Sequence, residues 1–237
     1  MNLSIVIPAY NEEDRIIRTI EQSLSFLNQQ AYASEIIVVS DGSTDNTVSV
    51  AEGFKTDGKV SLRTIEYHPN AGKGYAVRTG MLAAAGEIIM FMDADYAVPI
   101  IELDKGLKWM KLTYDIAIGS RGISGSVVHD HQNFFREFSA RLYTVIQNRY
   151  LGISYKDTQC GFKMFSKTAA HKLFSMQKLN SVIFDPEILW LARKTGFRVA
   201  EFPVTWSHIG NSRIQYDSLK KSIFIFQELF RIKRLHR

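Results

Sequence analysis

Short apolar runs alternate with stretches of helical periodicity through the first half of the chain. The apolar runs cover residues 3–8, 35–40, 88–92 and 115–119, and residues 60–65 also look like a strand. Uninterrupted runs of this length are typical of strands that a parallel sheet buries on both faces. Between them lie stretches with the spacing of helices, at residues 15–30, 46–55, 73–85 and 99–112. Strands that alternate with helices predict an α/β fold with a mostly parallel central sheet flanked by helices.

The regular alternation stops after Arg121. Residues 122–128 are rich in glycine and serine and predict a mobile loop, and residues 157–163 predict a polar loop between apolar segments. We expect a long helix at residues 132–150, a second helix that starts at Asp185, a late strand at residues 197–203 and a basic amphipathic helix from residue 212 onward.

The run at residues 88–92 leads directly into Asp93 and Asp95. In open α/β sheets, ligands bind at the edge where the strands end. Two carboxylates there repel each other and are costly to desolvate, so a divalent cation that also holds a substrate phosphate would fit between them. The alternative is a solvated loop with two aspartates.

Further strand ends carry polar side chains toward the same edge, at residues 8–12 (PAYNE), 41–43 (DGS) and 119–121 (GSR). Carboxylates there could bind a base or ribose hydroxyls. For any one residue, such as Asn11 or Asp45, helix capping is the simpler explanation. Four polar strand ends at one edge favour a ligand site.

Lys73 lies in a glycine loop, residues 70–74 (NAGKG), before a predicted helix. The loop lacks the Walker spacing, and no dinucleotide-binding glycine motif follows the first strand, so a nicotinamide fold is not expected. Lys73 could neutralise a phosphate, although a solvated lysine in a glycine turn is the alternative.

Composition limits the partners and the compartment. The 237 residues carry a formal net charge of +5, which favours anionic partners. No recognised nucleic-acid motif is present, so nucleic acid is not expected. The single cysteine, Cys160, excludes an internal disulfide and suits a reducing, cytoplasmic compartment. We expect neither a signal peptide nor a membrane span, because the first strand starts almost at Met1 and no run approaches roughly 20 apolar residues.

These motifs resemble the family-2 inverting glycosyltransferases, which have the Rossmann-like GT-A fold. In the first half, the resemblance rests on residues 8–12, 41–45 (DGSTD), 70–74 and 93–95 (DAD). The second half is similar to the dolichyl-phosphate β-glucosyltransferases and, less closely, to the dolichyl-phosphate mannose synthases. That likeness rests on residues 118–121 (IGSR), 157–165 (DTQCGFKMF), 184–189 (FDPEIL), 204–206 (VTW) and 212–213 (SR).

The resemblance implies roles at the donor. Asp93 and Asp95 would hold Mg²⁺ or Mn²⁺ on the diphosphate of the nucleotide-sugar, which Arg213 would also reach, with Lys73 as a further phosphate ligand. The nucleoside would be contacted by Pro8, Tyr10, Glu12 and Asp41. Residues 1–95 would form the nucleotide-sugar half of a single catalytic domain, residues 1–215.

It also implies roles at the acceptor, in residues 96–215. Arg121 and Arg136 would bind an acceptor phosphate, and Gln159 and Asp185 would face the sugar and the acceptor. The residues expected at the reacting atoms are Asp95, Asp185 and Arg121.

The reaction implied is transfer of a hexose, glucose from UDP-glucose, to a polyprenyl or dolichyl phosphate with inversion. A lipid phosphate is already a nucleophile, whereas a polysaccharide or glycolipid hydroxyl needs a base, for which Asp185 is the candidate. Asp185 could instead cap the helix before Pro186. A GDP-mannose-dependent polyprenyl-phosphate mannosyltransferase, a nucleotide-sugar-binding module without activity, and a nucleotidyltransferase remain alternatives, although the last should carry a glycine loop after the first strand.

Residues 216–237 predict a basic amphipathic helix. Its apolar stripe, Leu219, Ile223, Phe226 and Phe230, is bordered by the cations Lys220, Lys221, Arg231, Lys233, Arg234 and Arg237. Such a helix can lie in a bilayer interface, which would make the protein peripheral at the cytoplasmic face of a membrane. The alternative is a helix packed on the domain.

Overall fold

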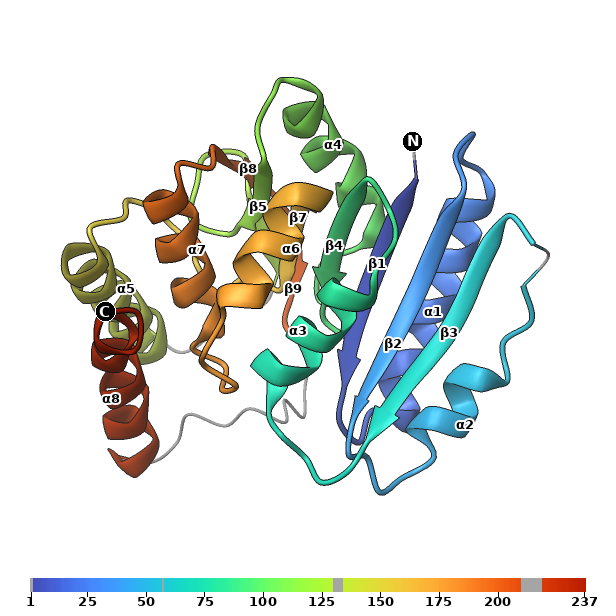
Figure 1. Cartoon of the computed structure of the whole chain (residues 1–237), viewed down its shortest axis with the longest axis horizontal. Coiled ribbons are helices and arrows are strands. Elements are labelled where there is room, and N and C mark those ends of the chain that lie inside the picture. Colours follow the sequence, from blue (N-terminus) through green and yellow to red (C-terminus); the bar gives the residue numbers. More distant parts are fainter. Residues whose placement is uncertain (1, 57, 130–133, 210–218) are drawn as a thin grey trace.

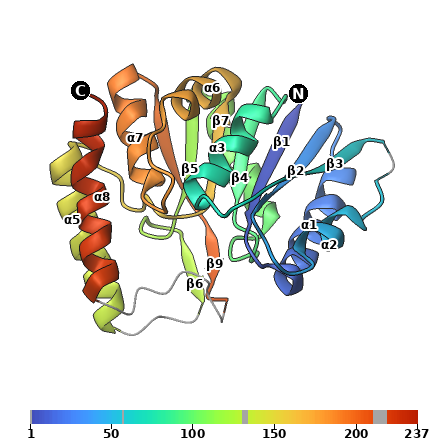
Figure 2. The same cartoon turned by 60° about the horizontal axis from the view of Figure 1, so that its bottom comes forward.

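A computed structural model describes residues 2–56, 58–129, 134–209 and 219–237, and within 134–141 and 219–222 only the backbone. Figures 1 and 2 show a central sheet with helices on both faces, as the sequence predicts.

Seven strands form the central sheet in the order β3-β2-β1-β4-β7-β5-β8. They are β1 Leu3–Ala9, β2 Ser34–Asp41, β3 Val60–Tyr67, β4 Ile88–Met92, β5 Ile116–Ser120, β7 Phe162–Ser166 and β8 Val199–Pro203. Neighbours are parallel except where β7 pairs with β4 and with β5. The six strands expected from the sequence, at residues 3–8, 35–40, 60–65, 88–92, 115–119 and 197–203, are therefore confirmed. The polar strand ends gather at one edge.

Two cores form on the two faces of the sheet because the side chains of each strand alternate. In β1, Ile5 and Ile7 point into one core and Val6 into the other. The Ile5 face is covered by α1 Glu13–Asn28, α2 Thr47–Glu52, η1 Ile100–Glu102 and α4 Leu103–Lys111. The Val6 face is covered by α3 Lys73–Ala83, α6 Lys167–Met176 and α7 Phe184–Thr195, with α5 Phe134–Leu151 and α8 Leu219–Leu235 beyond α7 (Figure 1).

Strand β7 corrects the expectation of a polar loop through Lys163. Residues from Phe162 onward form the only antiparallel strand of the described sheet, placed between β4 and β5. The charge of Lys163 interrupts the apolar pattern, which hides the strand in the sequence. Lys163 is 1% exposed and its Nζ lies 2.6 Å from Asp185 Oδ1, so the charge is buried with a partner.

A second, two-stranded sheet corrects the expectation of a mobile loop over residues 122–128. β6 Val127–His129 pairs in parallel with β9 Thr205–Ser207. The pairing joins two segments far apart in sequence, so no local pattern of residues announces it. It holds Trp206 close to the end of β5.

The C-terminal helix α8 packs on the domain. Leu229 and Ile232 have no exposed surface and belong to the core beside α7. Phe226, expected in an outward stripe, packs its ring 5.7 Å from that of Tyr143 in α5. The outward side of α8 still leaves three apolar residues about half exposed, namely Ile223, Phe224 and Phe230. None of the helices in the described ranges is both long enough and apolar enough to cross a bilayer.

Replacement of Lys163 by methionine should lower the free energy of unfolding by about 3 kcal/mol or more, because Asp185 would stay buried without a cation. Urea denaturation of the purified variant measures this change. Adding Asp185→Asn to Lys163→Met should recover part of the loss, since the unpaired charge is then removed. A single variant as stable as the unaltered chain would contradict the account of β7.

Candidate active site

Asp93 occupies the edge of the sheet at which β4 ends. It follows the last residue of β4, and its backbone N–H donates to the carbonyl of Gly161 at 3.1 Å. Its Oδ1 lies 2.6 Å from Nζ of Lys73, the first residue of α3. The two side chains are 32% and 22% exposed, so a ligand can reach this ion pair.

Gly161 lies directly against the carboxylate of Asp93. A Cβ atom at Gly161 would lie 2.1 Å from Asp93 Oδ2 and 2.3 Å from its Cγ. Any side chain at this position would therefore displace Asp93. The start of β7 thus fixes the direction in which the acid points.

Asp95, like Asp93, is partly buried. The Ala97 N–H donates to Asp95 Oδ1 at 3.0 Å. Burial raises the pKa of Asp95 above its ordinary value, and the charge of Asp93 raises it further. A divalent cation would relieve both effects. In the described part of the chain no group of three or more acidic, histidine or cysteine side chains forms a metal cluster, and two carboxylates fit a Mg²⁺-type ion completed by substrate phosphates and water.

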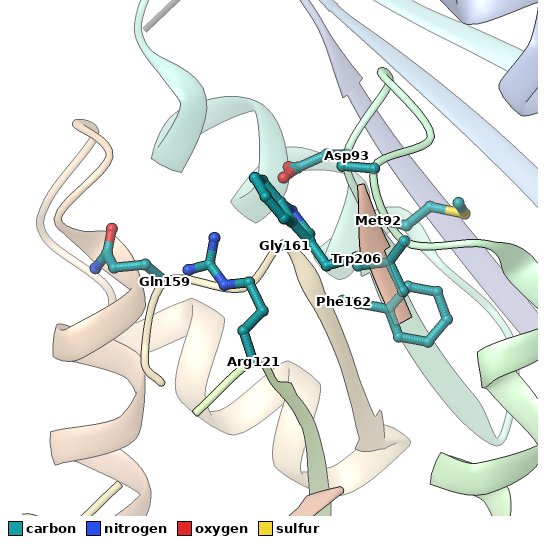
Figure 3. Close-up of a pocket in the computed structure, with 9 residues that line it drawn as sticks. Met92, Asp93, Arg121, Gln159, Gly161, Phe162 and Trp206 are labelled. Atoms are coloured by element: carbon teal, nitrogen blue, oxygen red, sulfur yellow. The ribbon is translucent and has the colours of Figure 1, made fainter. Parts of the chain in front are cut away.

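A cavity of about 30 Å³ lies beside Asp93 (Figure 3). It is lined by Met92, Asp93, Ala97, Val98, Arg121, Gln159, Gly161, Phe162 and Trp206. Three of the residues expected at the site, Asp93, Arg121 and Gln159, therefore meet at one cavity. Gln159 Nε2 is buried and has no hydrogen-bond partner within the described residues, which leaves it as a donor for a ligand.

Arg121 is fixed by Asp157. Its Nε and Nη2 donate to the two carboxylate oxygens at 2.6 Å and 3.0 Å, and its backbone N–H donates to Oδ2 at 3.0 Å. The Trp206 ring lies 5.4 Å from the guanidinium carbon. Burial alone would raise the pKa of Asp157, but the charge and hydrogen bonds of Arg121 outweigh it and lower this pKa to about 2. Asp157 in turn raises the pKa of Arg121. The site thus presents a permanent cation with a set orientation.

Asp41 holds the loop that presents Lys73. Its carboxylate accepts hydrogen bonds from the backbone N–H groups of Ala71 at 2.7 Å and of Gly72 at 3.0 Å, and from the Tyr67 hydroxyl at 2.9 Å. Burial and the bond to Asp41 raise the pKa of Tyr67. Asp41, expected at the nucleoside, is therefore engaged with the glycine loop.

Comparisons with known proteins identify the family of this chain. The model for Glycosyl transferase family 2 matches residues 4–174. The chain belongs to glycosyltransferase family 2. A dolichyl-phosphate β-glucosyltransferase from Drosophila melanogaster is 38% identical over 226 residues, which cover 90% of this chain and 69% of that protein. The enzyme of the same name from Homo sapiens is 34% identical over 224 residues, with coverage of 90% and 69%.

Solved structures share the GT-A fold that the sequence predicts. Glucosyl-3-phosphoglycerate synthase from Mycobacterium tuberculosis, in complex with UDP, has a TM-score of 0.67 and 21% identity over 98% of this chain and 79% of that one. Mannosyl-3-phosphoglycerate synthase from Rubrobacter xylanophilus has a TM-score of 0.70 and 16% identity, covering all of this chain and 74% of that one.

In this family 2 glycosyltransferase, the motif at residues 8–12 contains an exposed aromatic ring, Tyr10, and an acid that is held by hydrogen bonds, Glu12. Tyr10 is 41% exposed just after β1, whereas Pro8 is buried within the strand. Glu12 accepts two hydrogen bonds from Arg15, each at 2.6 Å, at the start of α1. Among the residues expected at the nucleoside, Tyr10 is thus the one most open to a base.

The structure of this family 2 enzyme does not bring Asp185 to the surface of the cavity. Asp185 is 2% exposed, and burial raises its pKa even though Lys163 pairs with it. The sequence led us to expect Asp185 to face the sugar. The difference arises because β7 buries the Lys163 charge beside Asp185, and a buried cation needs an acid as its partner. No side-chain hydrogen bond caps α7 either.

The Arg136 side chain and all of Arg213 lie outside the described residues, so their expected roles stay predictions. Asp157 and Trp206, which orient Arg121, received no role from the sequence. The sequence segments that contain them were noted, but no local pattern in a single sequence predicts that residues 121, 157 and 206 come into contact.

Substitution of Asp157 by asparagine should remove a pH-dependent part of the stability. Asp157 has a pKa of about 2 in the folded chain against an ordinary 3.8. Its stabilisation, about 2 kcal/mol, is therefore complete above pH 5 and is lost as the pH falls from about 4 to 2. Urea denaturation between pH 7 and pH 2.5 should show the gap between the unaltered chain and Asp157→Asn closing in that window.

Asp14→Asn controls for the change of net charge, because Asp14 is exposed. A gap between the unaltered chain and Asp157→Asn that stays constant down to pH 2.5 would argue against a strong Arg121–Asp157 pair.

Proposed function

We propose that this glycosyltransferase transfers glucose from UDP-glucose to a polyprenyl phosphate, with inversion at the anomeric carbon. The observation that carries the proposal is the pair of charge centres at one cavity: Asp93 with Lys73 on one side and Arg121 on the other. A reaction between two anions, a sugar diphosphate and a phosphate acceptor, needs both. The names of the relatives, dolichyl-phosphate β-glucosyltransferases at 30–38% identity, support the same donor sugar and acceptor class.

The donor diphosphate would lie at the start of α3. Lys73 there is next to the N-terminus of a helix, which favours an anion. Asp93 and Asp95 would hold Mg²⁺ or Mn²⁺, and the bound ion would neutralise charge on the leaving diphosphate. A structural neighbour that is 20% identical was crystallised with Mn²⁺ and uridine-diphosphate-glucose, which supports a metal and this donor. Tyr10 is placed to contact the base.

The acceptor phosphate would bind Arg121, with Gln159 donating a further hydrogen bond. An oxygen of the phosphate attacks the anomeric carbon as the bond to the diphosphate breaks, in one displacement that inverts the centre. A phosphate oxygen needs no general base. The burial of Asp185 against Lys163 supports this acceptor over a hydroxyl, which would need a base at the cavity.

Membrane contact would come from α5 and α8. These helices pack against each other, and each leaves apolar side chains exposed, namely Leu142 and Val145 of α5 and Ile223, Phe224 and Phe230 of α8. Cations follow along the outer side of α8 at Arg231 and Arg234. Exposed apolar groups next to cations fit the surface of an anionic bilayer. We place the protein at the cytoplasmic face of a membrane, where a polyprenyl phosphate would be available.

Release of nucleoside diphosphate from a panel of UDP- and GDP-sugars, with Mn²⁺ and with or without a short polyprenyl phosphate, tests the proposal. We expect release from UDP-glucose that needs both the metal and the lipid. Release from GDP-mannose, and not from UDP-glucose, would support the alternative of a polyprenyl-phosphate mannosyltransferase. Release that is indifferent to the lipid would contradict the phosphate acceptor, and no metal-dependent binding of any donor would contradict the enzyme.

Two variants distinguish the donor part of the site from the acceptor part in this assay. Asp93→Asn should lower release by 100-fold or more, since the leaving charge loses its neutralisation. Arg121→Gln should raise the KM for the lipid phosphate at least tenfold while donor binding stays within twofold. An Arg121→Gln variant that loses donor binding to the same degree would place Arg121 at the donor.

A further inference from the structure

The glycine loop that carries Lys73 is held from two sides. Asp41 holds it on one side. On the other side lie residues 177–181, the first part of the connection between α6 and α7. The Gly74 N–H donates to the Asn180 carbonyl at 2.8 Å, and Gln177 Nε2 donates to the Gly74 carbonyl at 2.8 Å. A Cβ atom at Gly72 would lie 2.5 Å from the Asn180 oxygen, so the two segments touch without room for a side chain.

The connection 177–181 is in turn held by Glu187. Glu187 lies in the first turn of α7 and has no exposed surface. Its Oε1 accepts a hydrogen bond from the Lys178 N–H at 2.8 Å, and its Oε2 accepts one from the Leu179 N–H at 2.9 Å. A buried carboxylate between two backbone donors fixes the path of the connection.

The C-terminal helix contacts the same two elements. Nε2 of His236, just after α8, lies 2.5 Å from Glu187 Oε1, and the Ser181 hydroxyl donates to Glu228 Oε2 of α8 at 3.1 Å. The C-terminal segment, α8 together with His236, is thus bonded both to the acid that holds the connection and to the connection itself. A continuous set of hydrogen bonds runs from α8 to the loop next to Lys73.

We infer that Glu187 is a positioning residue for donor binding, and that the seating of α8 on α7 helps to set the glycine loop. The inference rests on the proposed function, in which Lys73 binds the donor diphosphate. It gives the C-terminal helix a role at the nucleotide site in addition to its proposed contact with lipid. By linkage, donor binding should also stabilise the seated position of α8.

Glu187→Gln is the sharpest change because it keeps the size of the side chain. A carboxylate only accepts, whereas glutamine replaces one acceptor oxygen with a donor NH₂ group. Both backbone partners of Glu187 donate, so one of these bonds must be lost. We expect the dissociation constant of UDP in the presence of Mn²⁺, measured by calorimetry on the full chain, to rise roughly tenfold. The KM for the polyprenyl phosphate should stay within twofold.

Glu102→Gln is the matched control. Glu102 is also a buried acid, 4% exposed, and it pairs with Lys105 at 2.6 Å on the opposite face of the sheet. It should leave the UDP affinity unchanged. A merely structural role of Glu187 would lower stability in both variants without the selective loss of donor affinity.

A second pair of variants tests the contribution of α8 to UDP binding. This pair tests the inference by itself if Glu187→Gln does not fold. His236→Ala removes one bond from α8 to Glu187, and Gln227→Ala removes an exposed side chain of the same helix. We expect His236→Ala to weaken UDP binding about threefold and Gln227→Ala to have no effect. In the unaltered chain, UDP with Mn²⁺ should slow amide hydrogen exchange in residues 225–235, and His236→Ala should reduce that protection.

The outcomes separate the inference from the proposed function. If the unaltered chain binds UDP and the folded Glu187→Gln variant, or His236→Ala in its place, binds it equally well, the inference is overturned while the donor stands. If the unaltered chain binds no UDP, the proposed donor fails and the inference fails with it.

Discussion

The ion pair between Asp93 and Lys73 determines how the rest of the site is built. Two aspartates at the end of β4 place like charges close together at the edge of the sheet, and burial of Asp95 makes the repulsion harder to tolerate. Lys73 relieves part of this repulsion, because its Nζ lies 2.6 Å from Asp93 Oδ1. For this contact to exist, the loop before α3 must approach β4, and Gly161 of β7 must leave room for the acid. The sheet order, which places β7 beside β4, meets the second need.

Paired charges recur around this centre. Arg121 is held by Asp157, Lys163 by Asp185 and Arg15 by Glu12. A cation whose direction is fixed before the substrate arrives needs little reorganisation during the reaction. The partly exposed cations, Lys73 and Arg121, are those that the proposed reaction uses. The buried pair of Lys163 and Asp185 supports β7 behind them.

Much of the fold could be predicted from the sequence because buried strands leave continuous apolar runs. Strands β1, β2 and β4 and the acid pair after β4 follow from that pattern. Strand β7 was missed because Lys163 breaks the run, and its partner Asp185 lies 22 positions away. The same distance in sequence explains why the pairing of Asp185 with a buried lysine was not predicted. Neither Asp157 nor Glu187 could be found from spacing, since each binds groups that only the folded chain brings near: the Arg121 side chain and backbone for Asp157, and two backbone N–H groups for Glu187.

A structure of the full chain with Mn²⁺ and UDP would test the central claim most directly. The account predicts a metal ion bound to carboxylate oxygens of both Asp93 and Asp95. It also predicts that Lys73 Nζ turns from Asp93 to the diphosphate, with the glycine loop still held by Asp41 and Asn180. A nucleotide bound elsewhere, or bound with the Lys73–Asp93 pair intact and no metal on the acids, would contradict it.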